Sequence, residues 1–291
     1  MSFSYLKEIE DIAKEQNIPF WRVIIEDDMK ERNVSFEESF ETMRGMYRAM
    51  KEADAAYDAS LRSASGLVGG DGAKLEVFRQ KKNRLIGDFL TEVMEKAVKM
   101  SESNACMKRI VAAPTAGSCG VIPAVLLTYE KQREALEDRL VEALFVAAGI
   151  GEVIAASASI AGAEGGCQAE IGSASAMAAG AIAYLEGGKE EEIVHAAALA
   201  LKNMLGLTCD PVAGLVEVPC VKRNVSGAVN AIVSSQMAIA GIRSAILPDE
   251  VIDSMRRIGK LLPTCLRETG QEGLAITPTA MEVVRRLKED A

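Results

Sequence analysis

The stretch from Ala169 to Tyr184 reads AEIGSASAMAAGAIAY and decides the fold. It consists mainly of Ala, Gly and Ser, with Met177, and has almost no bulky side chains, so neighbouring backbones can approach it closely. A helix that is apolar on all sides belongs in the interior of a protein. We therefore expect residues 169–186 to form a central, shielded helix.

The composition favours the same architecture. Hydrophobic residues make up 49% of the 291 positions and aromatic residues only 4%, so the core must consist of Ala, Val, Ile, Leu and Met. This balance is typical of closely packed helices. The length allows one large domain or two ordinary ones. A net charge of −9 argues against nucleic-acid binding, which requires a basic surface.

Helical patterns recur along most of the chain. A capping box at Ser35–Glu38 predicts a helix that runs to about Ala56, and Pro123 suits the first turn of another. Further helices are expected at residues 75–103, 120–133, 138–163, 189–205, 224–244 and 249–262, and after Thr277. The one β-strand that the sequence allows is a short one at residues 110–113.

These patterns predict an all-α fold. We expect an Ala/Gly-rich multi-helix catalytic domain at residues 63–291 and a polar helical N-terminal arm at residues 1–62, with both in one continuous domain. The segment 143–163 is apolar enough to be mistaken for a membrane span. Because Glu152 would be costly at the centre of a bilayer, a buried helix is the expected structure. Charged residues among the first 16 exclude a secretory signal, so the expected location is the cytoplasm.

Two segments place cysteines in turns rich in Gly or Pro: Glu164-Gly-Gly-Cys167-Gln-Ala-Glu170, and Thr208-Cys209-Asp-Pro with Val218-Pro-Cys220. Amides in such turns can point at an anionic sulfur, and a cysteine that only packs has no need of them. None of the short Cys-x-x-Cys pairs typical of zinc sites occurs. From the residues alone, Cys167, Cys209 and Cys220 are as compatible with packing as with metal binding.

Two loops have an ordinary interpretation beside a functional one. The glycine-rich loop 63–72 precedes Lys74, but no Ser or Thr follows that lysine, so it is not a P-loop. It is either a flexible connector or a mobile loop beside a substrate. The second loop, Thr115-Ala-Gly-Ser118, precedes a helix N-terminus, where amides suit a carboxylate or phosphate. Alternatively, Thr115 or Ser118 is a simple N-cap.

His195 is the only histidine and lies on an expected helix. We expect it to be structural, which argues against a hydrolase triad and against most base catalysis by this chain. Cys106 and Cys265 are expected to pack only, and Cys119 stays open.

Taken together, these segments resemble the alpha chain of the bacterial iron–sulfur L-serine dehydratases. The resemblance covers nearly the whole chain, and its motifs occur in the family's order. They lie at residues 65–71, 113–120, 164–170, 209–214, 218–220 and 267–270.

The resemblance implies that Cys167, Cys209 and Cys220 hold a [4Fe–4S] cluster and that no pyridoxal phosphate is used. An iron without a cysteine ligand would act as a Lewis acid on the hydroxyl and carboxylate of L-serine, giving pyruvate and ammonia. Single-chain relatives end in a further cysteine, whose place falls at about Ala280 here. The fourth cluster position is then open, filled by water or substrate, or served by another chain.

The resemblance also implies a partner. The family's presumed base is a histidine in a Ser-His-Thr motif on a beta chain, and this motif is absent here. We expect the substrate carboxylate at the Thr115–Ser118 loop, with Glu164 and Gln168 flanking the cluster. The residues expected to contact substrate are Thr115, Gly117, Ser118, Glu164 and Gln168. Two alternatives remain: a cluster-bearing redox sensor or scaffold, and a related lyase that acts on L-cysteine.

Overall fold

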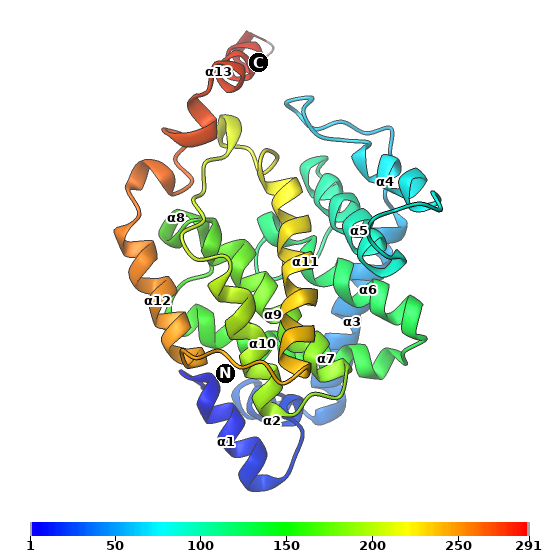
Figure 1. The fold of residues 1–291 in the computed structure, drawn as a ribbon, viewed down its shortest axis with the longest axis vertical. Coiled ribbons are helices and arrows are strands. Elements are labelled where there is room, and N and C mark those ends of the chain that lie inside the picture. Colours follow the sequence, from blue (N-terminus) through cyan, green and yellow to red (C-terminus); the bar gives the residue numbers. More distant parts are fainter. Residues whose placement is uncertain (1, 290–291) are drawn as a thin grey trace.

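The computed structural model describes residues 2–289 and confirms the all-α prediction (Figure 1). In this part of the chain there are thirteen α-helices and no β-strand. The helices are α1 (Leu6–Gln16), α2 (Phe20–Arg32), α3 (Phe36–Ala55), α4 (Asp71–Arg79), α5 (Asp88–Ala105), α6 (Val121–Arg133), α7 (Glu137–Ser157), α8 (Gly162–Gly165), α9 (Ser173–Leu185), α10 (Glu190–Lys202), α11 (Cys220–Ile239), α12 (Pro248–Leu261) and α13 (Pro278–Glu289). Short 3-10 or π turns lie between them: η1 (Ala116–Ser118), η2 (Gln168–Gly172), η3 (Val212–Gly214), η4 (Thr264–Leu266) and η5 (Gly273–Ile276).

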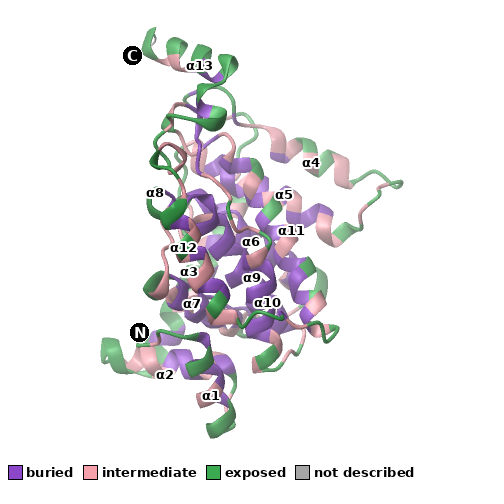
Figure 2. Cartoon of the chain, turned by 60° about the vertical axis from the view of Figure 1, so that its left-hand side comes forward, coloured by how far each residue is buried: buried purple, intermediate pink, exposed green. Residues whose placement is uncertain are grey.

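Helix α9 lies at the centre of the molecule, as its small residues predict. All its residues are buried, and it packs against α7, α10 and α11. A methyl group at Gly180 would lie 2.2 Å from Cδ1 of Ile150 on α7, so α7 and α9 approach each other where glycine leaves room. Figure 2 shows buried residues concentrated on these central helices and exposed residues on the outer ones.

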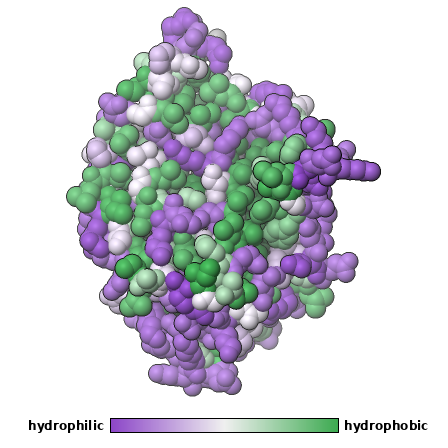
Figure 3. Space-filling view, in the orientation of Figure 1, coloured by the Kyte–Doolittle hydropathy of each residue, from purple (hydrophilic) through white to green (hydrophobic). Residues whose placement is uncertain are grey.

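The N-terminal helices α1 to α3 pack on the same core. Leu6, Phe20 and Ile24 are buried in the large apolar cluster to which α7 and α10 also contribute. In Figure 1, α1 and α2 lie at one end of the molecule and α13 at the other. Figure 3 shows mainly polar side chains at both ends and apolar ones in the middle of this face. The domain boundary predicted near residue 62 stays a prediction.

One long helix predicted from the sequence is wrong. Residues 75–103 form two helices, because α4 ends at Arg79 and α5 begins at Asp88. The segment between them is rich in Lys and Arg and ends in Gly87, whose extended backbone makes it the N-cap of α5.

Other boundaries differ in smaller ways. Helix α7 ends at Ser157, before the Ser- and Gly-containing segment that was predicted to continue it to residue 163. Helix α11 begins at Cys220 and not at Asn224, because Pro219 stands at its N-cap, where a proline does no harm. Residues 110–113 form no strand.

Helix α7 is the segment that resembles a membrane span. Its length and composition would suffice to cross a membrane, and 67% of its apolar window is buried inside the protein. It packs against α2, α3 and α9, which agrees with the expected buried helix.

Candidate functional site

The three cysteines singled out from the sequence converge in the structure. Cys167 directly precedes η2, Cys209 follows α10, and Cys220 is the first residue of α11. Their exposed fractions are 1%, 2% and 7%. Burial is the main cause of their raised pKa values, and each pair among the three also interacts electrostatically. The fold thus gathers three neighbouring buried thiols from separate segments.

Gly166 fixes the way in which Cys167 enters the site. Its φ is +77°, and a methyl group there would lie 2.7 Å from Cδ1 of Leu262 and 2.8 Å from the carbonyl oxygen of Leu207. The amide of Gln168 donates to that same carbonyl at 3.0 Å. Glycine alone suits both the backbone conformation and the space, which explains the glycine directly before Cys167.

Cys209 is held by the segment that carries the Arg-Glu-Thr-Gly motif. Its amide donates to the carbonyl of Leu266 at 2.9 Å, and its carbonyl accepts from the amide of Glu268 at 2.7 Å. These bonds form an isolated parallel bridge between Cys209 and Arg267. The motif therefore fixes the backbone of one of the three cysteines.

Arg223 places a positive charge beside the thiols. It lies almost one turn along α11 from Cys220, and it donates to the carbonyl of Thr208 at 2.7 Å and to Asp210 at 3.0 Å. Burial opposes its charge, but Cys167 and Asp210 outweigh burial and raise the pKa of Arg223. This guanidinium can offset negative charge on the sulfur atoms.

Burial suppresses ionisation of the three thiols. It raises the pKa of Cys167 to about 11 and that of Cys220 to about 12, and it raises the pKa of Cys209 well above its ordinary range. Because the thiolate is the form that binds metal, a metal at this site must displace protons.

The Thr115–Gly120 loop lies beside the cysteines, but the α6 N-terminus that follows it is capped. The amide of Gly120 donates to Oδ1 of Asn224 at 2.8 Å. The Nδ2 group of Asn224 donates to the carbonyls of Gly117 at 2.7 Å and Cys220 at 3.0 Å. Asn224 is 0% exposed and ties the loop to the first turn of α11. The N-cap amide of α6 is therefore already paired within the fold.

The predicted substrate residues of this loop already contact one another. The hydroxyl oxygens of Thr115 and Ser118 lie 3.0 Å apart, and the amide of Thr115 donates to Oγ of Ser118 at 3.3 Å. The capping interpretation is thus supported. Gly117 lies against a carboxylate, because a methyl group there would be 3.2 Å from Oε1 of Glu170. Substrate contact by Thr115, Gly117 and Ser118 stays a prediction.

The two remaining substrate candidates differ in position. Glu164 is exposed on α8 and accepts a hydrogen bond from Ser159 at 2.8 Å. Gln168 is 0% exposed, donates to the carbonyl of Met255 at 3.1 Å and accepts from the amide of Gly206 at 2.8 Å. Both ends of its amide are used within the fold. The geometry therefore favours a structural role for Gln168, and its substrate contact stays a prediction.

Sequence reasoning missed Glu170, Arg223 and Asn224 as parts of the site. Glu170 was within reach, because it lies three residues after Cys167. Arg223 and Asn224 follow Cys220 by three and four residues, a spacing that places them on one side of a helix. That signal was lost because the helix was predicted to begin at Asn224.

The glycine-rich loop 63–72 is anchored to Glu217, which lies in the segment between two of the three cysteines. Glu217, 4% exposed, accepts a hydrogen bond from Ser63 at 2.6 Å and another from Ser65. Arg286 on α13 donates to the carbonyl of Ser65 at 2.6 Å. Because Glu217 lies between Cys209 and Cys220, this loop braces the segment that carries both cysteines. Its interpretation as a flexible connector or as a mobile loop beside a substrate stays a prediction.

Cys119 and the histidine occupy packing positions, whereas Cys106 and Cys265 are half-buried and their packing role stays a prediction. Cys119 is 0% exposed and lies in a small apolar cluster with Met100 and Ala53. His195 is 9% exposed, and its Nδ1 accepts a hydrogen bond from the amide of Ser244 at 3.2 Å. This is the structural role expected for it.

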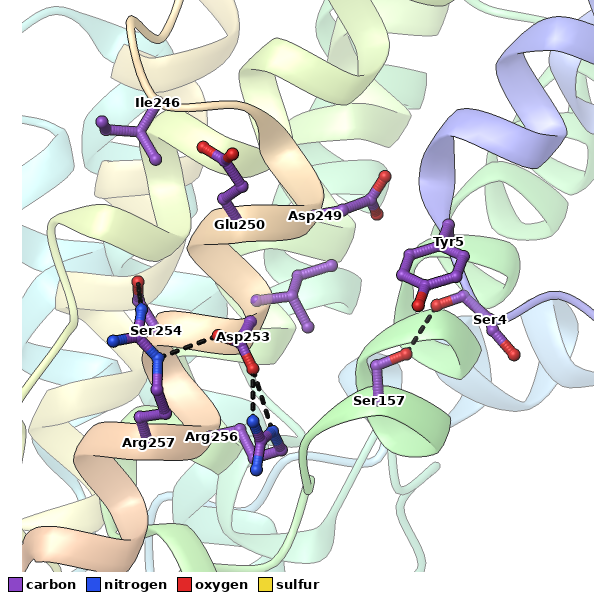
Figure 4. A pocket seen from close by; sticks show the side chains of 11 residues that line it. Ser4, Tyr5, Ser157, Ile246, Asp249, Glu250, Asp253, Ser254, Arg256 and Arg257 are labelled. Atoms are coloured by element: carbon purple, nitrogen blue, oxygen red, sulfur yellow. Dashed lines mark hydrogen bonds and ion pairs between the residues drawn. The ribbon is translucent and has the colours of Figure 1, made fainter.

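A large groove lies elsewhere. Its volume is about 930 Å³, and it runs between α12, the end of α7 and the residues before α1 (Figure 4). Tyr5 and Asp253 line it, and Arg256 and Arg257 both bind Asp253 there. None of the three cysteines borders this groove, so its size alone does not identify it as the reaction site.

Comparison with known proteins gives a consistent assignment. The family described as serine dehydratase alpha chain matches residues 15–275. The chain is 46% identical to the probable L-serine dehydratase alpha chain of Bacillus subtilis, over 98% of this chain and 95% of that protein. It is 38% identical to the L-serine dehydratase alpha chain of Peptoniphilus asaccharolyticus, over 96% of each.

A third relative is longer. The L-serine dehydratase TdcG of Escherichia coli is 46% identical over 182 residues, which is 62% of this chain and 40% of that protein. Together these matches confirm the resemblance found in the sequence and the assignment to a lyase. The chain therefore belongs to the serine dehydratase alpha chain family.

Proposed function

We propose that this chain is the cluster-bearing subunit of a cytoplasmic L-serine dehydratase, which converts L-serine to pyruvate and ammonia. The observation that supports this most is the convergence of Cys167, Cys209 and Cys220 beside Arg223. The relatives at 46% and 38% identity are named for the same substrate.

The chemistry of the three thiols suits an iron–sulfur cluster. Among residues 2–289, no three His, Cys, Asp or Glu side chains lie close enough to share one metal ion. The cysteines of a cluster bind different irons, so they stand farther apart than the ligands of one ion. Soft thiolates are also the ligands that iron–sulfur clusters require.

The residues of this chain then have separate tasks. When bound, a [4Fe–4S] cluster held by three thiolates supplies an iron that can act as a Lewis acid on the serine hydroxyl and carboxylate. Arg223 offsets the negative charge of the thiolates. Asn224 holds the Thr115–Ser118 loop against Cys220, so that the amides of the loop can face the substrate carboxylate. No pyridoxal phosphate is needed in this scheme.

The catalytic base must come from another residue or another chain. His195 is the only histidine, and its Nδ1 is occupied by the amide of Ser244. The relatives that are matched over nearly their whole length are named alpha chains, which implies an enzyme with a second subunit. We propose that a beta chain supplies the base.

The reconstituted chain alone is therefore expected to show no serine turnover, and its beta chain is expected to restore turnover. The measurement is pyruvate formation from L-serine, with iron content determined on the same samples. Rapid pyruvate formation by the chain alone would place the base within it and contradict this assignment.

The same assay separates the alternatives. A redox sensor or scaffold would carry iron in both samples and produce pyruvate in neither. A lyase for L-cysteine would release sulfide from L-cysteine faster than pyruvate from L-serine.

A further inference from the structure

We infer that Glu170 binds the α-ammonium group of the substrate and so makes the site selective for α-amino acids. This inference rests on the proposed function, since it assigns one more group in the same site.

The position of Glu170 is the first step. The residue lies in η2, three residues after Cys167. A methyl group at Gly162 would lie 2.9 Å from Oε2 of Glu170 and 3.2 Å from Sγ of Cys209, so the carboxylate and this sulfur are neighbours. On its other side the carboxylate faces Gly117. Glu170 therefore stands between the cysteines and the Thr115–Ser118 loop.

The absence of a cationic partner is the second step. Among the residues described, no Lys or Arg pairs with Glu170. Burial is the main cause that raises the pKa of Glu170; the hydroxyl of Thr115 opposes this shift, and the nearby Glu268 adds to it. A partly buried carboxylate of this kind is costly to keep ionised unless a positively charged group pairs with it.

The other acidic groups nearby are engaged or exposed. Asp210 accepts from Arg223 at 3.0 Å and from the amide of Leu274 at 2.9 Å. Glu164 and Glu268 are exposed. Glu170 is thus the carboxylate left for a ligand.

The shape of the substrate is the third step. An α-amino acid carries a carboxylate, an ammonium and a side chain on one carbon. With the carboxylate at the Thr115–Ser118 loop and the hydroxyl toward the cysteines, the ammonium is the group that remains. Glu170 lies beside both places and can accept a charge-assisted hydrogen bond from it.

The test compares L-serine with 3-hydroxypropanoate, which has hydrogen in place of the ammonium. Binding of each to the cluster-loaded complex with the beta chain is measured by titration calorimetry, with L-serine titrated under conditions that block turnover. The wild-type complex is expected to prefer L-serine by about 100-fold or more. Glu170→Gln is expected to lose most of this preference at unchanged iron content, while its affinity for 3-hydroxypropanoate does not fall.

Two further variants keep the test decisive. Glu268→Gln removes a neighbouring negative charge and is expected to preserve most of the preference. Glu170→Asp keeps the carboxylate and is expected to retain part of the preference for L-serine. If the Glu170→Gln protein loses its iron, the Glu170→Asp protein takes its place in the test.

Two outcomes overturn the inference in distinguishable ways. A wild-type complex that turns over L-serine but binds both compounds equally overturns the ammonium site alone, as does a Glu170→Gln complex that keeps the full preference. An iron-loaded complex that forms no pyruvate overturns the proposed function, and the ammonium site with it.

Discussion

Exchange of Cys209 for serine is expected to lower the turnover of L-serine by about 1000-fold or more and to remove most of the bound iron. Cys209 is 2% exposed, and the backbone of Leu266 and Glu268 fixes it from both sides. A hydroxyl is a far poorer ligand for iron in a cluster than a thiolate. The loss of an iron that acts as a Lewis acid withdraws several kcal/mol of transition-state stabilisation.

Pyruvate formation by the reconstituted complex and iron content of the same sample check this expectation. Cys167→Ser and Cys220→Ser are expected to behave in the same way. Cys106→Ser is the matched control, because Cys106 is half-buried at the end of α5 and should keep both iron and turnover. Full turnover by Cys209→Ser would remove this cysteine from the site.

Exchange of Asn224 for alanine is expected to lower the free energy of unfolding by about 3 kcal/mol or more. The side chain is 0% exposed and joins the amide of Gly120 to the carbonyls of Gly117 and Cys220. Its loss leaves the amide of Gly120 and the carbonyl of Gly117 in the interior without their side-chain partner. It also frees the Thr115–Ser118 loop from the first turn of α11, so serine turnover is expected to fall further than stability alone explains.

Urea unfolding of the two proteins measures the first effect, and KM and kcat at full iron content measure the second. Asn203→Ala is the control, because Asn203 is exposed and donates to Asn230 at 2.6 Å outside the site. It is expected to cost less than about 1 kcal/mol. If Asn224→Ala were as stable as Asn203→Ala, Asn224 would not hold the loop.

The centre of the fold could be predicted from the sequence because its signal is local. The predicted helix at 169–186 is confirmed for residues 173–185, which form the buried helix α9, whereas residues 168–172 form the π turn η2. The capping box at Ser35 likewise marks the start of α3. The break between α4 and α5 was missed, because a single Gly87 in a polar segment looks like a tolerated interruption of a longer helix.

The site divides in a similar way. Each of its cysteines carries a local signal, namely the Gly- or Pro-rich turn around it. The family resemblance then assigned the three cysteines to one site. Asn224 and Glu217 carry no such signal, because their partners Gly117 and Ser63 lie more than 100 residues away in the chain. Contacts of that kind exist once the helices have packed, and no local pattern announces them.

Iron and sulfide content after anaerobic reconstitution tests the central claim most directly. A chain whose three buried cysteines hold a [4Fe–4S] cluster should retain about four irons and four sulfides after gel filtration. The triple variant Cys167→Ser, Cys209→Ser, Cys220→Ser should retain almost none. A triple variant that binds as much iron as the unaltered chain would contradict the claim that these residues form the cluster site.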